Sequence, residues 1–210
     1  MKVKRASVAH LLLVCSMALI LACSGADNES TVKVGESRIK LIPYPSPGFT
    51  LIDDSNGRAY AAAVKLLGGG EPVLAIYTDS IGWNKFIEGM TADGAENMFP
   101  HAATISTDER GANQTISPAQ FVELSLRVSQ KLSEDGDGTI VIGSDSRYFT
   151  ALETYSLQDG IDLKILTTTI LVEGKILTLA TFCLSGSPFE DQFQSSALAW
   201  RDAYLKQTKP

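Results

Sequence analysis

The sequence predicts an α+β fold in which about three helices pack on one mostly antiparallel sheet and a C-terminal helix closes the domain. Two observations lead to this prediction. Between residues 139 and 184, four successive segments are rich in β-branched and aromatic residues, which favour strands. On either side of that block, Ser117–Gln120 and Ser187–Glu190 each precede apolar residues at helical spacing.

Residues 1–22 have the pattern of a lipoprotein signal peptide. Lys2, Lys4 and Arg5 give a basic start, and an apolar core of about ten residues follows. That core is too short for a transmembrane helix, which needs about 20 apolar residues. Ile20-Leu21-Ala22-Cys23 resembles the lipobox of bacterial lipoproteins. The resemblance implies cleavage before Cys23 and its acylation by chains such as palmitate. An ordinary signal peptide with a chance cysteine is the alternative.

An acylated Cys23 would anchor this protein to a membrane. Each buried methylene of an acyl chain contributes about 0.8 kcal/mol, so several chains hold firmly. Ser24 follows Cys23, where well-studied enterobacterial lipoproteins of the inner membrane carry aspartate. The resemblance therefore implies a lipid-anchored protein of the cell envelope that faces the periplasm. It favours the outer membrane over the inner membrane.

Cleavage changes the composition of the mature chain. Loss of the three basic residues moves the formal net charge from −6 to −9. An acidic surface argues against binding to nucleic acid or to anionic lipid. Cys183 would be the only cysteine left beside Cys23. We therefore expect no intramolecular disulfide, and a fold that depends on its hydrophobic core.

The mature chain divides into two parts. Residues 23–37 comprise the lipidated cysteine and a polar sequence without periodicity, which predicts a flexible tether. Residues 38–210 are long enough for a single α+β domain with a substantial core.

The start of the domain is predicted to be extended. Pro43, Pro45 and Pro47 lack a donor for a sheet ladder, so they indicate an edge or an extended entry segment. Segments 59–67 and 72–79 flank three glycines and are predicted to form a hairpin.

Three helices are predicted from apolar stripes. In two of them, a serine cap, a proline in the first turn and a Gln or Glu three residues after the serine form a capping box. The stripes consist of Trp83, Phe86, Ile87 and Met90; of Phe121, Leu124, Val128 and Leu132; and of Phe193, Ala197, Trp200 and Tyr204.

Four strands are predicted between the second and third helices, at 139–143, 148–157, 162–172 and 175–184. Glu173 and Gly174 form the tight turn between the last two. Because 175–184 is apolar on both faces, we expect it at the centre of the sheet. Cys183 on this strand is interpreted as a small buried hydrophobic residue.

This order of elements resembles the PsbP-like fold over about residues 38–206. That fold includes the extrinsic photosystem II protein, the Ran-binding Mog family and the DcrB-type bacterial lipoproteins. The resemblance implies a non-catalytic adaptor or assembly protein, and it carries no functional residue over to this chain.

The inventory of catalytic residue types favours a protein that is not an enzyme. A Ser-His-Asp triad needs a histidine base, and His101 is the only histidine after cleavage. It follows Phe99-Pro100 and is predicted to be a solvated loop residue. One histidine and one free cysteine cannot supply the usual zinc ligands. We therefore predict no catalytic residue and no cofactor.

The acidic segment 133–146 could form a calcium loop. Asp135 and Asp137 match the first two ligand positions of an EF-hand. However, Ile140 stands where glycine is required, and Ser146 replaces the bidentate glutamate. The competing interpretation, a solvated turn after a helix that ends near Leu132, is favoured.

Two classes of function follow. The first is a membrane-anchored lipoprotein that acts as a non-catalytic binding or assembly adaptor for an envelope protein. The second is a small-ligand carrier, or a hydrolase with an unfamiliar site. A flat apolar surface rimmed by charge would favour the first, and a convergent polar pocket would favour the second.

Overall fold

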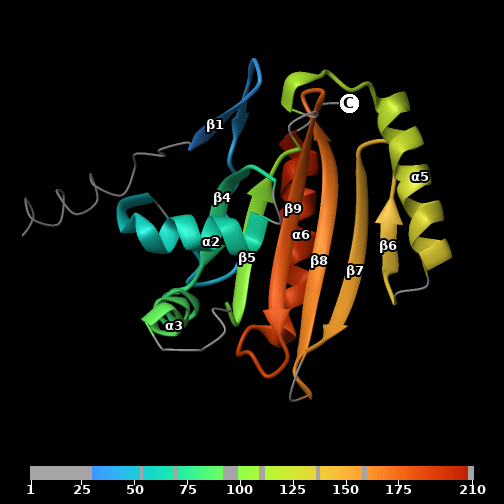
Figure 1. Ribbon diagram of the computed structural model, residues 1–210. Coiled ribbons are helices and arrows are strands. Elements are labelled where there is room, and N and C mark those ends of the chain that lie inside the picture. Colours follow the sequence, from blue (N-terminus) through green and yellow to red (C-terminus); the bar gives the residue numbers. More distant parts are fainter. Residues whose placement is uncertain are drawn as a thin grey trace, which may run out of the picture. The chain divides into compact units, whose positions relative to one another are not determined.

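One antiparallel sheet organises the protein, as a computed structural model shows (Figure 1). The structure describes residues 30–207 except 53, 69–70, 92–98, 109–111, 136–137 and 158–159. Cys23 and the predicted signal peptide lie outside the described residues. The seven strands lie in the order β3 (Thr50–Leu51), β4 (Val73–Thr78), β5 (His101–Ser106), β9 (Lys175–Leu184), β8 (Asp162–Val172), β7 (Tyr148–Ser156) and β6 (Ile140–Ser144).

The predicted strand block is confirmed. β6, β7, β8 and β9 match the four predicted segments, and β9 lies between β5 and β8 inside the sheet. The turn between β8 and β9 has φ of 50° at Glu173 and 74° at Gly174. Two consecutive residues with positive φ form the tight turn that suits the right-handed twist of a hairpin.

The described residues contain four α-helices, where about three were predicted. They are α2 (Arg58–Gly68), α3 (Ser80–Thr91), α5 (Pro118–Asp135) and α6 (Phe193–Gln207). The hairpin predicted for 59–67 and 72–79 is wrong, because 59–67 lies in α2. This segment is rich in alanine and leucine, both strong helix formers, and that preference outweighs the signal from the glycines that follow it.

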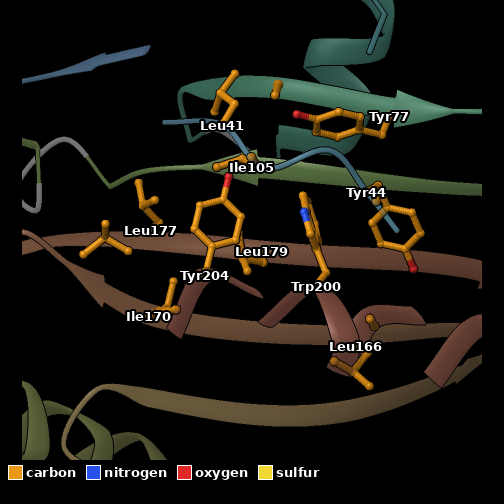
Figure 2. Close-up of a cluster of buried hydrophobic side chains, with 14 of the residues drawn as sticks. Leu41, Tyr44, Tyr77, Ile105, Leu166, Ile170, Leu177, Leu179, Trp200 and Tyr204 are labelled. Carbon is orange, nitrogen blue, oxygen red and sulfur yellow. The ribbon is translucent and has the colours of Figure 1, made fainter. Parts of the chain in front are cut away.

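The α+β class is confirmed, and α6 packs on one face of the sheet against β8 and β9. Phe193, Ala197, Trp200 and Tyr204, the predicted stripe, are all at most 4% exposed. Figure 2 shows Trp200 and Tyr204 reaching from α6 toward Leu177 and Leu179 of β9. The buried face of α6 therefore packs the C-terminal end of the domain onto the sheet.

A second core lies on the opposite face of the sheet. Side chains alternate along β4, so Ala75 and Tyr77 join the α6 core while Ile76 joins the second. Ala63 of α2 and Phe86 of α3 complete that second core and are both fully buried. Helices therefore cover both faces of the sheet.

The folded part begins earlier in the chain than predicted, because β1 lies within the segment 23–37 that was predicted to be a tether. Strands β1 (Thr31–Val34) and β2 (Ser37–Lys40) form a separate two-stranded hairpin. Val34 and Ile39 are 1% exposed and belong to the α6 core. The polar composition of this segment conceals two apolar side chains that point to the same side of the hairpin.

The proline segment after β2 is fastened to α6 through Ile42. The indole Nε1 of Trp200 donates to the Ile42 carbonyl at 2.8 Å, and the Ile42 N–H donates to the Tyr204 hydroxyl at 3.0 Å. Both backbone polar groups of Ile42 are thus satisfied without a sheet ladder. The neighbouring prolines could not continue such a ladder.

Two buried tyrosines are expected to respond oppositely to loss of their hydroxyls. Tyr204→Phe removes the acceptor of the Ile42 N–H and should lower the free energy of unfolding by about 1 kcal/mol. Tyr44 is 3% exposed, and its hydroxyl makes no hydrogen bond of 3.5 Å or less among the described residues, although burial, which raises its pKa, is partly offset by the nearby Thr181 side chain, which lowers it. Tyr44→Phe should therefore be neutral or stabilising, by up to about 1 kcal/mol. Urea unfolding of the two variants measures the difference, and equal losses would contradict it.

Candidate functional site

His101 is the first residue of β5 and is 1% exposed. The prediction of a solvated loop residue is wrong. His101 lies opposite Cys183 of the central strand β9, and the rings of Phe49 and Phe189 pack near it, with centroids 5.5 and 5.7 Å away. Pairing in the sheet and this aromatic cover remove the imidazole from solvent.

Both ring nitrogens of His101 have partners from other elements. Nε2 is 2.9 Å from Oδ1 of Asp79, which follows β4. Nδ1 is 2.8 Å from Oγ of Ser187, which lies between β9 and α6. With Asp79 ionised, Nε2–H donates to it, so in the neutral imidazole Nδ1 accepts from the Ser187 hydroxyl. The fold therefore assembles Ser, His and Asp from three separate segments.

Asp79 is also the N-cap residue of α3, which begins at Ser80. Its Oδ1 accepts the Gly82 N–H at 2.7 Å, the usual bond of a helix N-cap. A Cβ on Gly82 would lie 2.2 Å from Oγ1 of Thr78, so only glycine fits there. Burial raises the pKa of Asp79, but hydrogen bonds from Gly82 and His101 outweigh it and hold the pKa below the ordinary value of 3.8.

The capping box predicted at Ser187–Glu190 is wrong. A 3₁₀ turn at Glu190–Gln192 precedes α6, which begins at Phe193. The Ser187 hydroxyl accepts the Phe189 N–H at 3.2 Å. Glu190 instead accepts the Gly186 N–H at 2.7 Å and pairs with Lys164 of β8 at 2.7 Å. Ser187 and Glu190 thus stabilise the turn between β9 and α6 rather than the start of a helix. The ion pair with Lys164 holds Glu190 against β8, so its carboxylate cannot cap a helix at Ser187.

The backbone of the turn at Ser187 has no free N–H group to stabilise an oxyanion. An oxyanion hole needs free hydrogen-bond donors, which are commonly backbone N–H groups beside the nucleophile. The Ser187 N–H donates to the Leu184 carbonyl, residue 188 is proline, and the Phe189 N–H already bonds the Ser187 hydroxyl. Burial also raises the pKa of the Cys183 thiol to about 11, so it is not a ready nucleophile. This cluster ties three segments together.

A different feature stands out at the β6 end of the sheet (Figure 1). Six of the eleven large apolar side chains that are exposed in the described residues belong to α5 and β6. We call these six the α5–β6 surface: Val122, Leu124, Leu126, Val128, Ile140 and Val141. Apolar side chains concentrated on two neighbouring elements mark an interaction site more often than scattered ones do.

The helix α5 starts as predicted but packs differently. Ser117 and Gln120 bond one another's backbone N–H groups, at 3.3 and 2.8 Å, which confirms the capping box. Of its described side chains, Phe121 and Ser125 are the ones buried below 10% exposure. Leu124 and Val128, predicted to face the core, are 41% and 46% exposed. Only a narrow strip of α5 is buried, so the apolar side chains on both sides of that strip remain in solvent.

A hollow of about 240 Å³ lies beside one of these flanks. It is lined by Val122, Ser125, Leu126 and Ser129 of α5, and by Ser144, Asp145 and Ser146. Its lining joins apolar side chains to hydroxyls and a single carboxylate. On the helix, the α5–β6 surface therefore comprises two apolar flanks of α5, and the flank with Val122 and Leu126 borders a polar hollow.

Several predicted residues are not tested by this geometry. Cys23 and Asp137 lie outside the described residues, and Asp135 is the last residue of α5, three residues beyond the predicted end of the helix. Among the described helices, none is long and apolar enough to cross a membrane. No family model and no curated protein matches the chain.

Sequence reasoning missed both features of this section. Asp79 and Ser187 are residue types that favour helix N-caps. Their common contact with His101 depends on the pairing of β4, β5 and β9 and is not indicated by the sequence. The exposed flanks of α5 had a weak signal, since apolar residues at 121, 122, 124, 126 and 128 exceed one narrow stripe.

Proposed function

We propose that this chain is a lipid-anchored lipoprotein of the cell envelope that acts as a non-catalytic binding or assembly adaptor. In this proposal Cys23 carries the lipid, and the outer membrane is the favoured location. The described domain binds a protein partner through the α5–β6 surface.

The concentration of exposed apolar side chains on α5 and β6 carries this proposal. Leu126 is 58% exposed and Ile140 is 59% exposed; they belong to α5 and β6, which lie beside each other at one end of the sheet (Figure 1). Complete burial of a fully exposed side chain of this kind yields about 1.5–3 kcal/mol, so burying the exposed half of each one against a partner yields about half of that. The hydroxyls of the adjacent hollow offer polar contacts at the rim, as protein interfaces commonly have.

A hydrolase is the second candidate, because the Asp79–His101–Ser187 contacts are those of a charge-stabilised nucleophile. The absence of free N–H groups next to Ser187 argues against it, as does the burial of His101. The adaptor therefore remains the better supported function.

The proposal is tested by affinity isolation of the full-length protein from membranes in mild detergent. A protein that copurifies with the wild type should be lost from the variant Leu124→Gln/Leu126→Gln. Both side chains are exposed, so the fold should change by no more than about 0.5 kcal/mol for each substitution. Cys23→Ser should leave an unlipidated precursor.

The matched control is Leu66→Gln on α2, since Leu66 is 47% exposed and α2 contacts β4 and β5, whereas β6 lies at the other end of the strand order. It should retain the copurifying protein. If both variants lose the protein equally, or neither does, then α5 is not the docking element. Lipid label on Cys23→Ser at normal size would contradict the anchor.

A further inference from the structure

The hairpin β1–β2 has one apolar face and one basic face. Val34 and Ile39 are 1% exposed and belong to the α6 core. Because side chains alternate along a strand, the residues next to them point to the other face of the hairpin. That face carries Lys33, Arg38 and Lys40, all of them exposed, and we call these three residues the basic face.

Two cations of the basic face lie directly opposite each other. Lys33 pairs with Arg38 in the antiparallel register, and like charges opposed across a ladder destabilise it. Neither side chain forms an ion pair with an acidic side chain of the described residues. The only acidic residue of the segment 31–40 is Glu36, in the turn. Lys33 and Arg38 therefore present positive charge that no described carboxylate pairs with.

The turn of this hairpin is held against the rest of the domain. Gly35 has φ of 59°, and a Cβ there would lie 2.1 Å from the carbonyl oxygen of Ala112, so only glycine fits. The same oxygen accepts a hydrogen bond from Nζ of Lys175 at 3.1 Å, and Lys175 is 5% exposed. The two buried apolar side chains and this packed turn give the basic face a set orientation on the domain.

The hairpin is also close in the chain to the predicted lipid anchor. Lys33 is the first basic residue after Cys23, and Thr31 is eight residues after Cys23. A chain of that length spans at most about 30 Å when it is fully extended. With a lipid on Cys23, the start of the hairpin therefore stays within this distance of the lipid headgroups.

We propose that the basic face of β1–β2 docks on the anionic lipid headgroups of the membrane that holds the anchor. The proposal rests on the proposed function, because it requires the lipid on Cys23. An acyl anchor and a basic patch are two signals that reinforce each other at a membrane surface. The chain is acidic overall, so the rest of the domain is repelled and docking is confined to this face.

Docking of this face leaves the α5–β6 surface available. In Figure 1 the hairpin β1–β2 lies on the side of β4, whereas α5 lies beside β6 at the other end of the strand order. Anchor and basic face together would thus orient the domain, with the α5–β6 surface turned toward a protein partner rather than toward the headgroups.

The test uses the full-length lipidated protein in vesicles of phosphatidylcholine, with or without phosphatidylglycerol. A water-soluble reagent acetylates exposed lysines, and mass spectrometry gives the rate at each one. Lys33 and Lys40 should react at least about threefold more slowly in the vesicles with phosphatidylglycerol. Lys65 of α2 is exposed and should react equally in both. Salt at about 1 M shortens the Debye length to about 3 Å and should remove the difference.

Arg38→Glu distinguishes docking from mere closeness to the membrane. It should abolish the difference between the two kinds of vesicle at Lys33 and Lys40. Arg58→Glu makes the same change of charge at an exposed residue of α2 and should preserve that difference. Because Arg38→Glu replaces like charges across the ladder by opposite ones, its midpoint of thermal unfolding should equal or exceed that of the wild type.

Equal acetylation of Lys33 in both kinds of vesicle, by a protein that floats with both, would overturn the docking and leave the anchor and the adaptor intact. A difference that Arg38→Glu leaves unchanged would overturn it too. A wild type that fails to float with phosphatidylcholine vesicles would contradict the anchor and the docking together. The adaptor is judged separately, by the captured protein that Leu124→Gln/Leu126→Gln should lose.

Discussion

Replacing Trp200 by alanine is expected to lower the free energy of unfolding by about 3–5 kcal/mol. Trp200 is 1% exposed, and its ring lies 5.0 Å from that of Tyr44 and 5.7 Å from that of Tyr77. Truncation would leave a cavity where α6, β4 and the proline segment meet. It would also leave the Ile42 carbonyl without its donor. Urea unfolding of the purified protein measures the loss.

Two further variants separate packing from hydrogen bonding. Trp200→Phe keeps most of the ring but removes the indole N–H, so its loss should be clearly smaller, about 1–2 kcal/mol. Trp83 of α3 is only partly buried, and Trp83→Ala should also cost less than Trp200→Ala. A change within about 0.5 kcal/mol for Trp200→Ala would place this side chain on the surface.

His101→Ala is expected to lower the free energy of unfolding by about 2–3 kcal/mol, because a buried imidazole with two partners is removed. The variant leaves Asp79 and Ser187 without their shared contact between β4, β5 and the turn before α6. If His101 only ties these segments together, the surviving folded protein should keep its full adaptor function. Complementation of a deletion strain at permissive temperature measures this.

Asp79→Asn provides the matched control for the charge. The asparagine oxygen can still accept from Gly82 and His101, whereas the pH dependence of Asp79 disappears. Because the folded-state pKa of Asp79 lies below 3.8, its contribution to stability is present above that pH and is lost as the pH falls through the folded-state value. Wild type should therefore lose more stability than Asp79→Asn when the pH falls from about 5 to about 3.

The opposite outcome would promote the hydrolase. A stable but inactive His101→Ala protein, together with labelling of Ser187 by a fluorophosphonate in the wild type but not in the variant, would identify Ser187 as a nucleophile. Such labelling would require an oxyanion donor from outside the Ser187–Phe189 turn, whose own N–H groups are engaged.

Much of this fold depends on interactions between residues that are close in the sequence, and this part could be predicted from the sequence alone. The four strands between residues 140 and 184, the Glu173–Gly174 turn, the central position of β9 and the buried stripe of α6 all follow from patterns within a few residues. The same is true of the capping box at Ser117, because its two hydrogen bonds join residues three positions apart. Side-chain periodicity and backbone propensity act over this range.

Only the tertiary structure decided which side chains meet across long separations. His101 is buried because β9 and two aromatic rings surround it, and its partners lie 22 and 86 residues away in the chain. Val34 enters the core because the hairpin β1–β2 folds back, although its neighbours are polar. Leu124 and Val128 stay exposed because no described element covers the part of α5 on which they lie. Sequence periodicity identifies the apolar face of a helix or strand. Which residues of that face become buried depends on the neighbouring elements that pack against it.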